Sequence, residues 1–358
     1  MTRSVSGLAL SDDMHDTAAD LATLAKWPPL HNALVLLDEI LVPTFDAADM
    51  RALRSQRRYR WVILLTASGG SAAVLFALAQ LTLERLGLSE AALWAARGEV
   101  ASLGATVLAV VLGSLVVWLE HWLIDRFRAE QLRLLKFRAL LDPRIWGADK
   151  QRAAWRADVE TQHDRLAVLD RVELKHQSER EAVPRLVTRD ECREITPDSL
   201  DALVRYYLRK RVITQRDYFA AAASRGIAFF DRPKLLPAFF GFSVLIVAAH
   251  VAVDWWPAGA SVYAEKREIA STLLIAASAA LPVTWAGIRT WRSAREFSRN
   301  VARSAARREM LNEMAERLEG KREVEPSNLL GELQICELVL DSDQREWLRL
   351  MREVEWYG

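Results

Sequence analysis

The chain has 358 residues, a formal net charge of +1 and a mean hydropathy of zero. A charge balance this close to zero provides no overall field that would attract nucleic acid, so duplex nucleic acid is not expected as a partner. The two cysteines, Cys192 and Cys336, lie far apart and form no CxxC motif. This spacing argues against a disulfide framework and against a zinc site.

The mean hydropathy of zero hides a separation of apolar and charged residues along the chain. Four stretches contain no Asp, Glu, Lys or Arg, namely 61–83, 100–119, 235–253 and 269–288. Each approaches the roughly 20 residues that cross about 30 Å of hydrocarbon as a helix. We therefore expect four transmembrane helices arranged in two hairpins. About sixty mostly polar residues precede the first stretch, which is unlike a secretory signal sequence.

The segments outside these stretches also predict helices. Residues 126–182 are rich in Arg, Glu, Leu and Ala, and a further helix begins after Pro197 with Asp198 or Ser199 as its cap. Residues 295–319 predict a helix that leaves the fourth apolar stretch, and a last amphipathic helix follows Pro326. The predicted fold class is an all-α membrane protein, with two transmembrane helical hairpins and a cytoplasmic helical bundle.

Basic residues predict the orientation of the four spans. They gather before the first span, after the second, before the third and after the fourth, whereas the loops 84–99 and 254–268 hold two each. The positive-inside rule then places both termini and the long middle segment in the cytoplasm of a multi-pass inner-membrane protein. The predicted domains are 1–50 (N-terminal), 51–140 (first hairpin), 141–199 (helical) and 200–358 (second hairpin with C-terminal helices).

The stretch "YYLRKRVITQRDYF", residues 206–219, predicts an amphipathic helix with two polar residues on its apolar face, Arg211 and Gln215. A buried arginine prefers a bidentate carboxylate partner, which we expect on the closing helix, near Trp347. The candidate carboxylates there are Glu346, Glu353 and Glu355. The alternative is that Arg211 extends to solvent and pairs with nothing in particular.

Small residues within the apolar stretches form a second set of candidates. In the second stretch, Ala101, Ala105, Ala109 and Gly113 recur every fourth residue, and Ser102 and Thr106 lie beside them. The fourth stretch contributes Ser278 and Thr284. Such residues suit either close helix packing or a weakly polar pore lining, and both alternatives stay open. No stretch carries a charge at its middle, which disfavours an ion-coupled transporter.

The sequence contains no GxGxxG, Walker, GxSxG, HExxH or CxxC motif. We therefore expect no catalytic activity, no cofactor and no metal. Two classes of function remain. The first is a regulated membrane effector or channel, which would be a homo-oligomer because four spans make a poor pore alone. The second is a non-conducting membrane scaffold or sensor whose cytoplasmic helices bind a protein.

One architecture occurs twice in the sequence: basic helix, span, short loop, span, basic helix. The second copy combines "YYLRKRVITQRDYF", a two-span hairpin, Trp291 and the closing "CELVLDSDQREWLRLMREVEW". These features resemble the SLATT-type domain (SMODS and SLOG-associating two-transmembrane effector) over residues 200–358, and residues 50–140 resemble a degenerate second copy.

The resemblance implies a membrane effector of a bacterial antiviral defence system that forms pores when a signal arrives. It implies the lipid bilayer and further copies of the chain as partners. The activating signal would be a nucleotide or oligonucleotide second messenger, or a protein. The chain departs from the family pattern in having two hairpins and no recognisable nucleotide-sensing domain, so the activating ligand stays unassigned.

Overall fold

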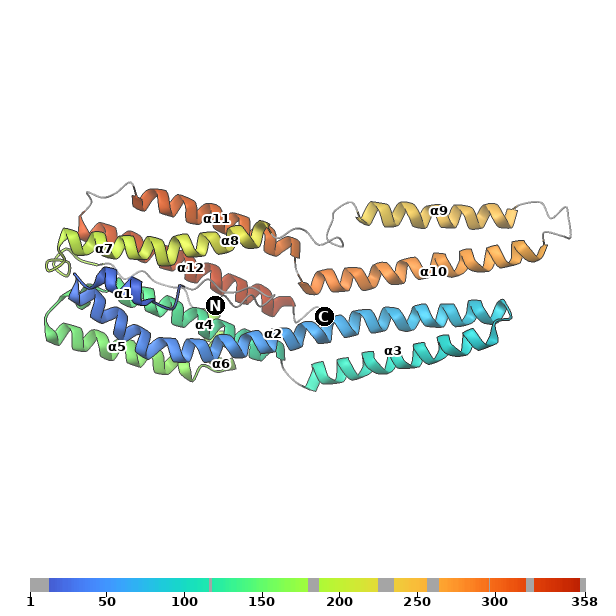
Figure 1. Cartoon of the computed structure of the whole chain (residues 1–358), viewed down its shortest axis with the longest axis horizontal. Helices are drawn as coiled ribbons and strands as arrows, with labels where there is room; N and C mark the ends of the chain where they lie inside the picture. Colours follow the sequence, from blue (N-terminus) through green and yellow to red (C-terminus); the bar gives the residue numbers. More distant parts are fainter. Residues whose placement is uncertain are drawn as a thin grey trace. The chain divides into compact units, whose positions relative to one another are not determined.

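A computed structural model describes residues 13–115, 118–179, 187–224, 235–255, 264–295, 297–319 and 325–354. These residues are helical almost throughout and include no β-strand, which confirms the all-α prediction for the described part of the chain (Figure 1). The chain forms two compact units, each assembled from separate stretches. Unit 1 draws on Met1–Gln56, Leu119–Ser224 and Val301–Gly358, and unit 2 draws on Arg57–Trp118 and Arg225–Asn300.

Unit 2 contains the predicted spans. Its helices are the second half of α2 (Pro28–Arg85), α3 (Ser89–Leu115), α9 (Leu235–Trp255) and α10 (Ala264–Arg295), with α9 alongside α10 (Figure 1). Three helices of the described chain are long and apolar enough to cross a membrane: Pro28–Arg85, Ser89–Leu112 and Lys266–Thr290. A further apolar helix, Gly241–Val253, is shorter and lies within the third predicted span.

A glycine turn joins α2 to α3. Gly87 has a φ of 71°, in the left-handed region that favours glycine. The N–H of Leu88 donates to the carbonyl of Leu83 at 2.9 Å, and the N–H of Gly87 donates to that of Glu84 at 3.1 Å. This pair of hydrogen bonds is the Schellman arrangement, which satisfies the last carbonyls of α2 and reverses the chain.

Unit 1 is a bundle of helices around one main apolar core. Besides the first half of α2, its elements are α1 (Ala18–Leu24), α4 (Trp118–Leu140), η1 (Pro143–Trp146), α5 (Asp149–Ala167), α6 (Arg171–Glu179), α7 (Pro197–Tyr207), η2 (Leu208–Ile213), α8 (Thr214–Ser224), α11 (Phe297–Glu319) and α12 (Pro326–Val354). Leu30, Leu34, Leu37 and Leu41 recur at helical spacing and are fully buried. This row packs α2 into the core shared with α4, α7 and α12.

The first residues of α7 show how the sequence starts a helix. Thr196 is the N-cap, because its side chain accepts a hydrogen bond from the N–H of Ser199, and Pro197 follows at the first helical position. The predicted cap, Asp198 or Ser199, was therefore two or three residues too late. Both of those residues belong to the helix itself.

The two units group the chain differently from the predicted linear domains 1–50, 51–140, 141–199 and 200–358. The basic helix predicted before the first span is part of α2, a single helix of 58 residues. The segments that were expected to be cytoplasmic come together in unit 1, although they lie far apart in the sequence.

Candidate functional site

Arg211 lies in unit 1 with its guanidinium almost completely buried, at 3% exposure. Its Nε and Nη2 donate to the two carboxylate oxygens of Glu337 at 2.9 and 3.0 Å, in a bidentate pair. Glu337 also accepts from the hydroxyl of Tyr207 at 2.7 Å. The closing helix α12 does supply the carboxylate for Arg211, which removes the alternative in which this side chain extends to solvent.

Glu346 was the wrong choice for that carboxylate. It lies nine residues beyond Glu337, which is about two and a half helical turns, so it occupies the opposite face of α12 and is exposed. The side chains of Glu353 and Glu355 lie outside the part of the chain that the structure describes. Trp347 is half-buried and meets Trp122 of α4 edge to face, with ring centroids 5.8 Å apart.

Gln215, the other predicted polar residue of the face, is buried and contacts the N-terminal segment. Its Nε2 donates to Asp13 Oδ2 at 2.7 Å, and Arg211 Nη1 donates to the same oxygen at 3.0 Å. Arg133 of α4 approaches Asp13 from another side, with Nε 2.7 Å from Oδ1. One carboxylate from a non-helical segment therefore meets three nitrogen groups from three elements.

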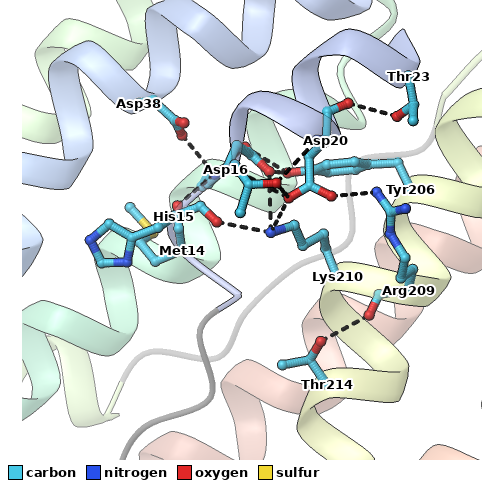
Figure 2. A network of polar contacts seen from close by, with 12 residues as sticks. Met14, His15, Asp16, Asp20, Thr23, Asp38, Tyr206, Arg209, Lys210 and Thr214 are labelled. Carbon is cyan, nitrogen blue, oxygen red and sulfur yellow. Dashed lines mark hydrogen bonds and ion pairs between the residues drawn. The ribbon is translucent and has the colours of Figure 1, made fainter. Parts of the chain in front are cut away.

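A second carboxylate of the same segment is bound in a similar way. Lys136 Nζ lies 2.7 Å from Asp16 Oδ2, and Tyr206 donates its hydroxyl to Asp16 at 2.9 Å. Lys210 Nζ lies 2.7 Å from Asp20 Oδ2 and donates to the carbonyl of His15 at 2.9 Å (Figure 2). We name residues 13–20 the acidic strap. We name the four buried cations that contact the strap the cationic seat: Arg133, Lys136, Lys210 and Arg211.

The local form of η2 explains how neighbouring cations reach the same segment. Leu208–Ile213 is a π-helix, whose hydrogen bonds join residues five apart and whose turn is wider than that of an α-helix. The angle about the helix axis between successive side chains is therefore smaller than in an α-helix. Arg209, Lys210 and Arg211 can then all contact the strap. The hydroxyl of Thr214 donates to the carbonyl of Arg209 at 2.9 Å within this wide turn (Figure 2).

The electrostatics of the cluster follow from burial and opposite charge. Burial alone would raise the pKa of Glu130, but the guanidinium groups of Arg126 and Arg133 lower it to about 2. Burial would raise the pKa of Asp20 as well, but hydrogen bonds from Lys210 and Thr17, together with the charge of Lys210, lower it to about 2. Burial would lower the pKa of Arg211, yet Glu337 and Asp13 raise it, so the guanidinium stays charged.

The sequence analysis missed further buried charges on α12. Glu337, Asp341 and Arg345 recur every fourth residue and are all buried. Asp341 accepts from Arg138 at 2.9 Å and from Arg345 at 3.0 Å. Their spacing was the available signal, because residues four apart share one helix face and this face also carries Leu333. The strap carboxylates had no such signal, since residues 13–17 follow no periodic pattern.

The small-residue candidates of unit 2 lie where α2 and α3 meet. A Cβ on Gly69 would clash with the Thr106 hydroxyl and would lie 3.2 Å from the carbonyl of Ser102. Ala109 is buried and Ala105 is exposed, so the contact runs along Ser102, Thr106 and Ala109. Within one chain these three residues pack helices together, whereas the predicted stripe of Ala101 and Ala105 is exposed.

The remaining candidates of unit 2 lie mainly on α10. Ser278 donates its hydroxyl to the carbonyl of Ile275 at 2.8 Å, and Thr284 donates to that of Ala280 at 2.9 Å. Gly287 of the same helix faces Ser71 and Ala67 of α2, which brings the two hairpins together. The surroundings of Gly113 lie outside the described side chains, although α3 includes the residue.

No described group of three or more His, Cys, Asp or Glu side chains is arranged to hold a metal ion. Comparisons of the chain with models of known protein families, with curated proteins and with solved structures found no match. The resemblance of residues 200–358 to the SLATT-type domain therefore remains a prediction. The functional argument accordingly depends on the geometry described above.

Proposed function

We propose that the chain is a multispan membrane effector whose subunits assemble into a regulated pore in the inner membrane. Unit 2 would cross the bilayer four times, through α2, α3, α9 and α10. Unit 1 would lie with both termini in the cytoplasm, as the basic flanks of the spans predict. A bacterial antiviral defence role is the biological setting that the SLATT resemblance suggests.

The observation that carries this proposal is the reversed burial pattern of unit 2. Among the side chains of unit 2 that the structure describes, the buried apolar ones are small: Ala67, Ala73, Ala92, Ala95 and Ala109. Its large apolar side chains point outward instead, with Val100 at 71% and Leu245 at 63% exposure. A water-soluble helical unit buries its large side chains, whereas membrane helices meet through small ones and expose large ones to lipid.

Several features favour conduction over coupled transport. The middle of each predicted span holds no ionisable residue, and such residues mark most coupled transporters. A pore lined by hydroxyls and small residues would be weakly selective, because it offers neither a charged ring nor a carbonyl filter. One chain provides too few helices for such a pore, so several copies would surround it.

Helix α10 is the best candidate to line that pore. The hydroxyl-bearing face of α3 is already used against α2 within the same chain. Ser278 lies nine residues before Gly287, so it occupies the side of α10 opposite the contact with Ser71. This side of α10 carries a hydroxyl that a neighbouring subunit or a pore could use.

Cysteine accessibility tests the proposal. In full-length protein with alanine at Cys192 and Cys336, a cysteine at Ser278 should react with a membrane-impermeant thiol reagent and block the current in planar bilayers. A cysteine at Leu273 is the control, because Leu273 is exposed on α10 and would face lipid. Current that neither cysteine alters would remove α10 from the lining. A stable oligomer without any current would favour a membrane scaffold instead.

A further inference from the structure

The side chains around Asp13 form a binding position for an oxyanion. The Asp13 carboxylate lies in this position but does not satisfy all of the surrounding hydrogen-bond donors. Arg133 Nε lies 2.7 Å from Asp13 Oδ1, but the two atoms lack hydrogen-bond geometry. Arg133 Nη2 is also buried, and the described residues offer it no hydrogen-bond partner. A buried guanidinium nitrogen without a partner is costly, so this position favours an anion with more acceptor oxygens than a carboxylate has.

A second pocket follows three residues along the strap. The carboxylate of Asp16 receives Lys136 and the hydroxyl of Tyr206 at hydrogen-bond distance, while Lys210 remains 3.7 Å away. Lys136 is fully buried. Two neighbouring positions for negative charge result: side chains of α4, η2 and α8 form the one at Asp13, and side chains of α4, α7 and η2 form the one at Asp16.

The carboxylates of the strap neutralise part of the positive charge of the cationic seat. Arg133, Arg211 and Lys136 each have one further carboxylate from the helices, namely Glu130, Glu337 and Asp38. Every contact that the structure gives Lys210 comes from the strap: the His15 carbonyl, Asp16 and Asp20. Departure of the strap would leave an excess of positive charge in a largely buried site.

The strap itself is held mainly by charge. Among residues 13–20 the only large apolar side chain is Met14, which is fully buried, while Ala18 and Ala19 are exposed. Residues 13–17 are not helical, and the helix that follows, α1, has only seven residues. A stronger anion can displace a segment attached in this way at the cost of one large apolar contact, that of Met14.

We propose that the cationic seat is a binding site for a small phosphate-bearing ligand with two or more charged groups, and that the acidic strap occupies this site as an internal substitute. A phosphate group carries more charge than a carboxylate and has three terminal oxygens. It can therefore engage Arg133 Nη2, to which the strap carboxylates give no hydrogen bond, and can approach Lys210 more closely than the 3.7 Å at which Asp16 lies. Binding of this ligand would release the strap, independently of whether the protein conducts ions.

Calorimetric titration of the purified full-length protein with inorganic triphosphate, at constant ionic strength, tests this proposal. The double substitution Asp13→Asn/Asp16→Asn should tighten triphosphate binding by about tenfold, because it weakens the competing strap. Asp149→Asn/Asp158→Asn is the matched control, since it removes two exposed charges from α5. Lys210→Met should abolish binding, whereas Lys150→Met, at an exposed position on α5, should leave it unchanged.

Two further measurements keep the proposal falsifiable if the double variant folds poorly. Met14→Ala loosens the strap without changing any charge, so it should also tighten binding. Triphosphate should speed amide hydrogen exchange in residues 13–24 and leave that of α5 unchanged. Equal affinities for Met14→Ala, wild type and the α5 control, or wild-type affinity in Lys210→Met, would overturn the proposal.

Discussion

Arg211 connects three segments of unit 1 through Asp13 and Glu337. Its replacement by alanine would leave the buried Glu337 without its cation and would remove one of the two arginines that contact Asp13. We expect Arg211→Ala to lower the free energy of unfolding by roughly 3–5 kcal/mol. Thermal or denaturant unfolding in detergent measures this effect. Arg205→Ala is the control, because Arg205 is exposed on α7 and its replacement should change stability by no more than about 0.5 kcal/mol.

A double-mutant cycle separates the true partner of Arg211 from its neighbours on α12. The coupling energy between Arg211→Ala and Glu337→Ala should be large, at roughly 1–3 kcal/mol, because the two side chains share two hydrogen bonds. Coupling between Arg211→Ala and Glu346→Ala should be close to zero, since Glu346 is exposed on the other face. Strong coupling with Glu346 and none with Glu337 would mean that α12 is rotated about its axis relative to the described structure.

Glu130 makes the stability of unit 1 depend on pH in the acidic range. The guanidinium groups of Arg126, Arg133 and Arg211 surround it, and its folded-state pKa of about 2 lies below its usual value of 4.5. The unfolded state therefore binds more protons in this range. The stabilisation is complete above about pH 4.5 and is lost as the pH falls through about 2.

We therefore expect the melting temperature of the protein to fall between pH 4.5 and pH 2. In Glu130→Gln the protein should be less stable at neutral pH, and its melting temperature should depend less on pH within that interval. Glu160→Gln, at an exposed position on α5, should follow the wild-type curve. An unchanged slope in Glu130→Gln would assign the acid sensitivity to other carboxylates.

At the scale of helices, adjacent glycines of α2 provide a matched comparison. A Cβ at Gly69 would meet Thr106 and the carbonyl of Ser102, whereas one at Gly70 would meet nothing within 4 Å. Both substitutions to alanine gain the same helix propensity, about 1 kcal/mol. We expect Gly69→Ala to have a lower melting temperature in detergent than Gly70→Ala, and the difference measures the α2–α3 contact. Equal melting temperatures would show that the two helices do not approach closely at this point.

Helix periodicity predicted the elements better than it predicted their partners. The apolar face that runs from α7 into η2, with the polar Arg211 on it, could be read from spacing, and so could the amphipathic closing helix. The pairing of Arg211 with Glu337 depends on how far α12 is displaced along its axis, and apolar spacing does not determine that displacement. The position of Glu337 around the helix was available, because it lies one turn from Leu333 on the buried face.

Two features had no local signal. A π-helix differs from an α-helix by one residue in its hydrogen bonding, and Leu208–Ile213 contains neither proline nor glycine to mark the change. The acidic strap has the composition of a solvated segment, and only the cations of α4 and η2 give its carboxylates a buried position. Both features depend on tertiary contacts between residues more than 100 positions apart.

For the whole molecule, the sequence predicted which residues are apolar enough for a membrane but not how the other segments assemble. The separation of apolar from charged stretches is visible in the sequence, and the helices that carry it form unit 2. Unit 1 combines three stretches of the chain: one before the first hairpin, one between the two hairpins and one after the second. Periodicity within each stretch could not predict that they share one core, because their contacts are all long-range.

The proposed topology predicts the outcome of reporter fusions. A reporter inserted after Gly87, in the turn between α2 and α3, should be active on the outer side of the membrane. A reporter inserted at Asp149, the first residue of α5, should be active in the cytoplasm, because Asp149 follows the second span and its basic flank. Alkaline phosphatase and a fluorescent protein report the two sides. Activity of the phosphatase at Asp149 would contradict the arrangement of four spans with cytoplasmic termini.

The long separation between Arg211 and Glu337 has a consequence for biosynthesis. Arg211 leaves the ribosome 126 residues before its partner, an interval of roughly 6 to 25 s at about 5 to 20 residues per second. During that interval the second pair of apolar stretches is synthesised, while the guanidinium lacks its bidentate carboxylate. A nascent chain that stops before α12 would leave unit 1 unfinished and open to proteases. A chain that ends before the closing helix should therefore be cleaved by proteases faster than the finished chain.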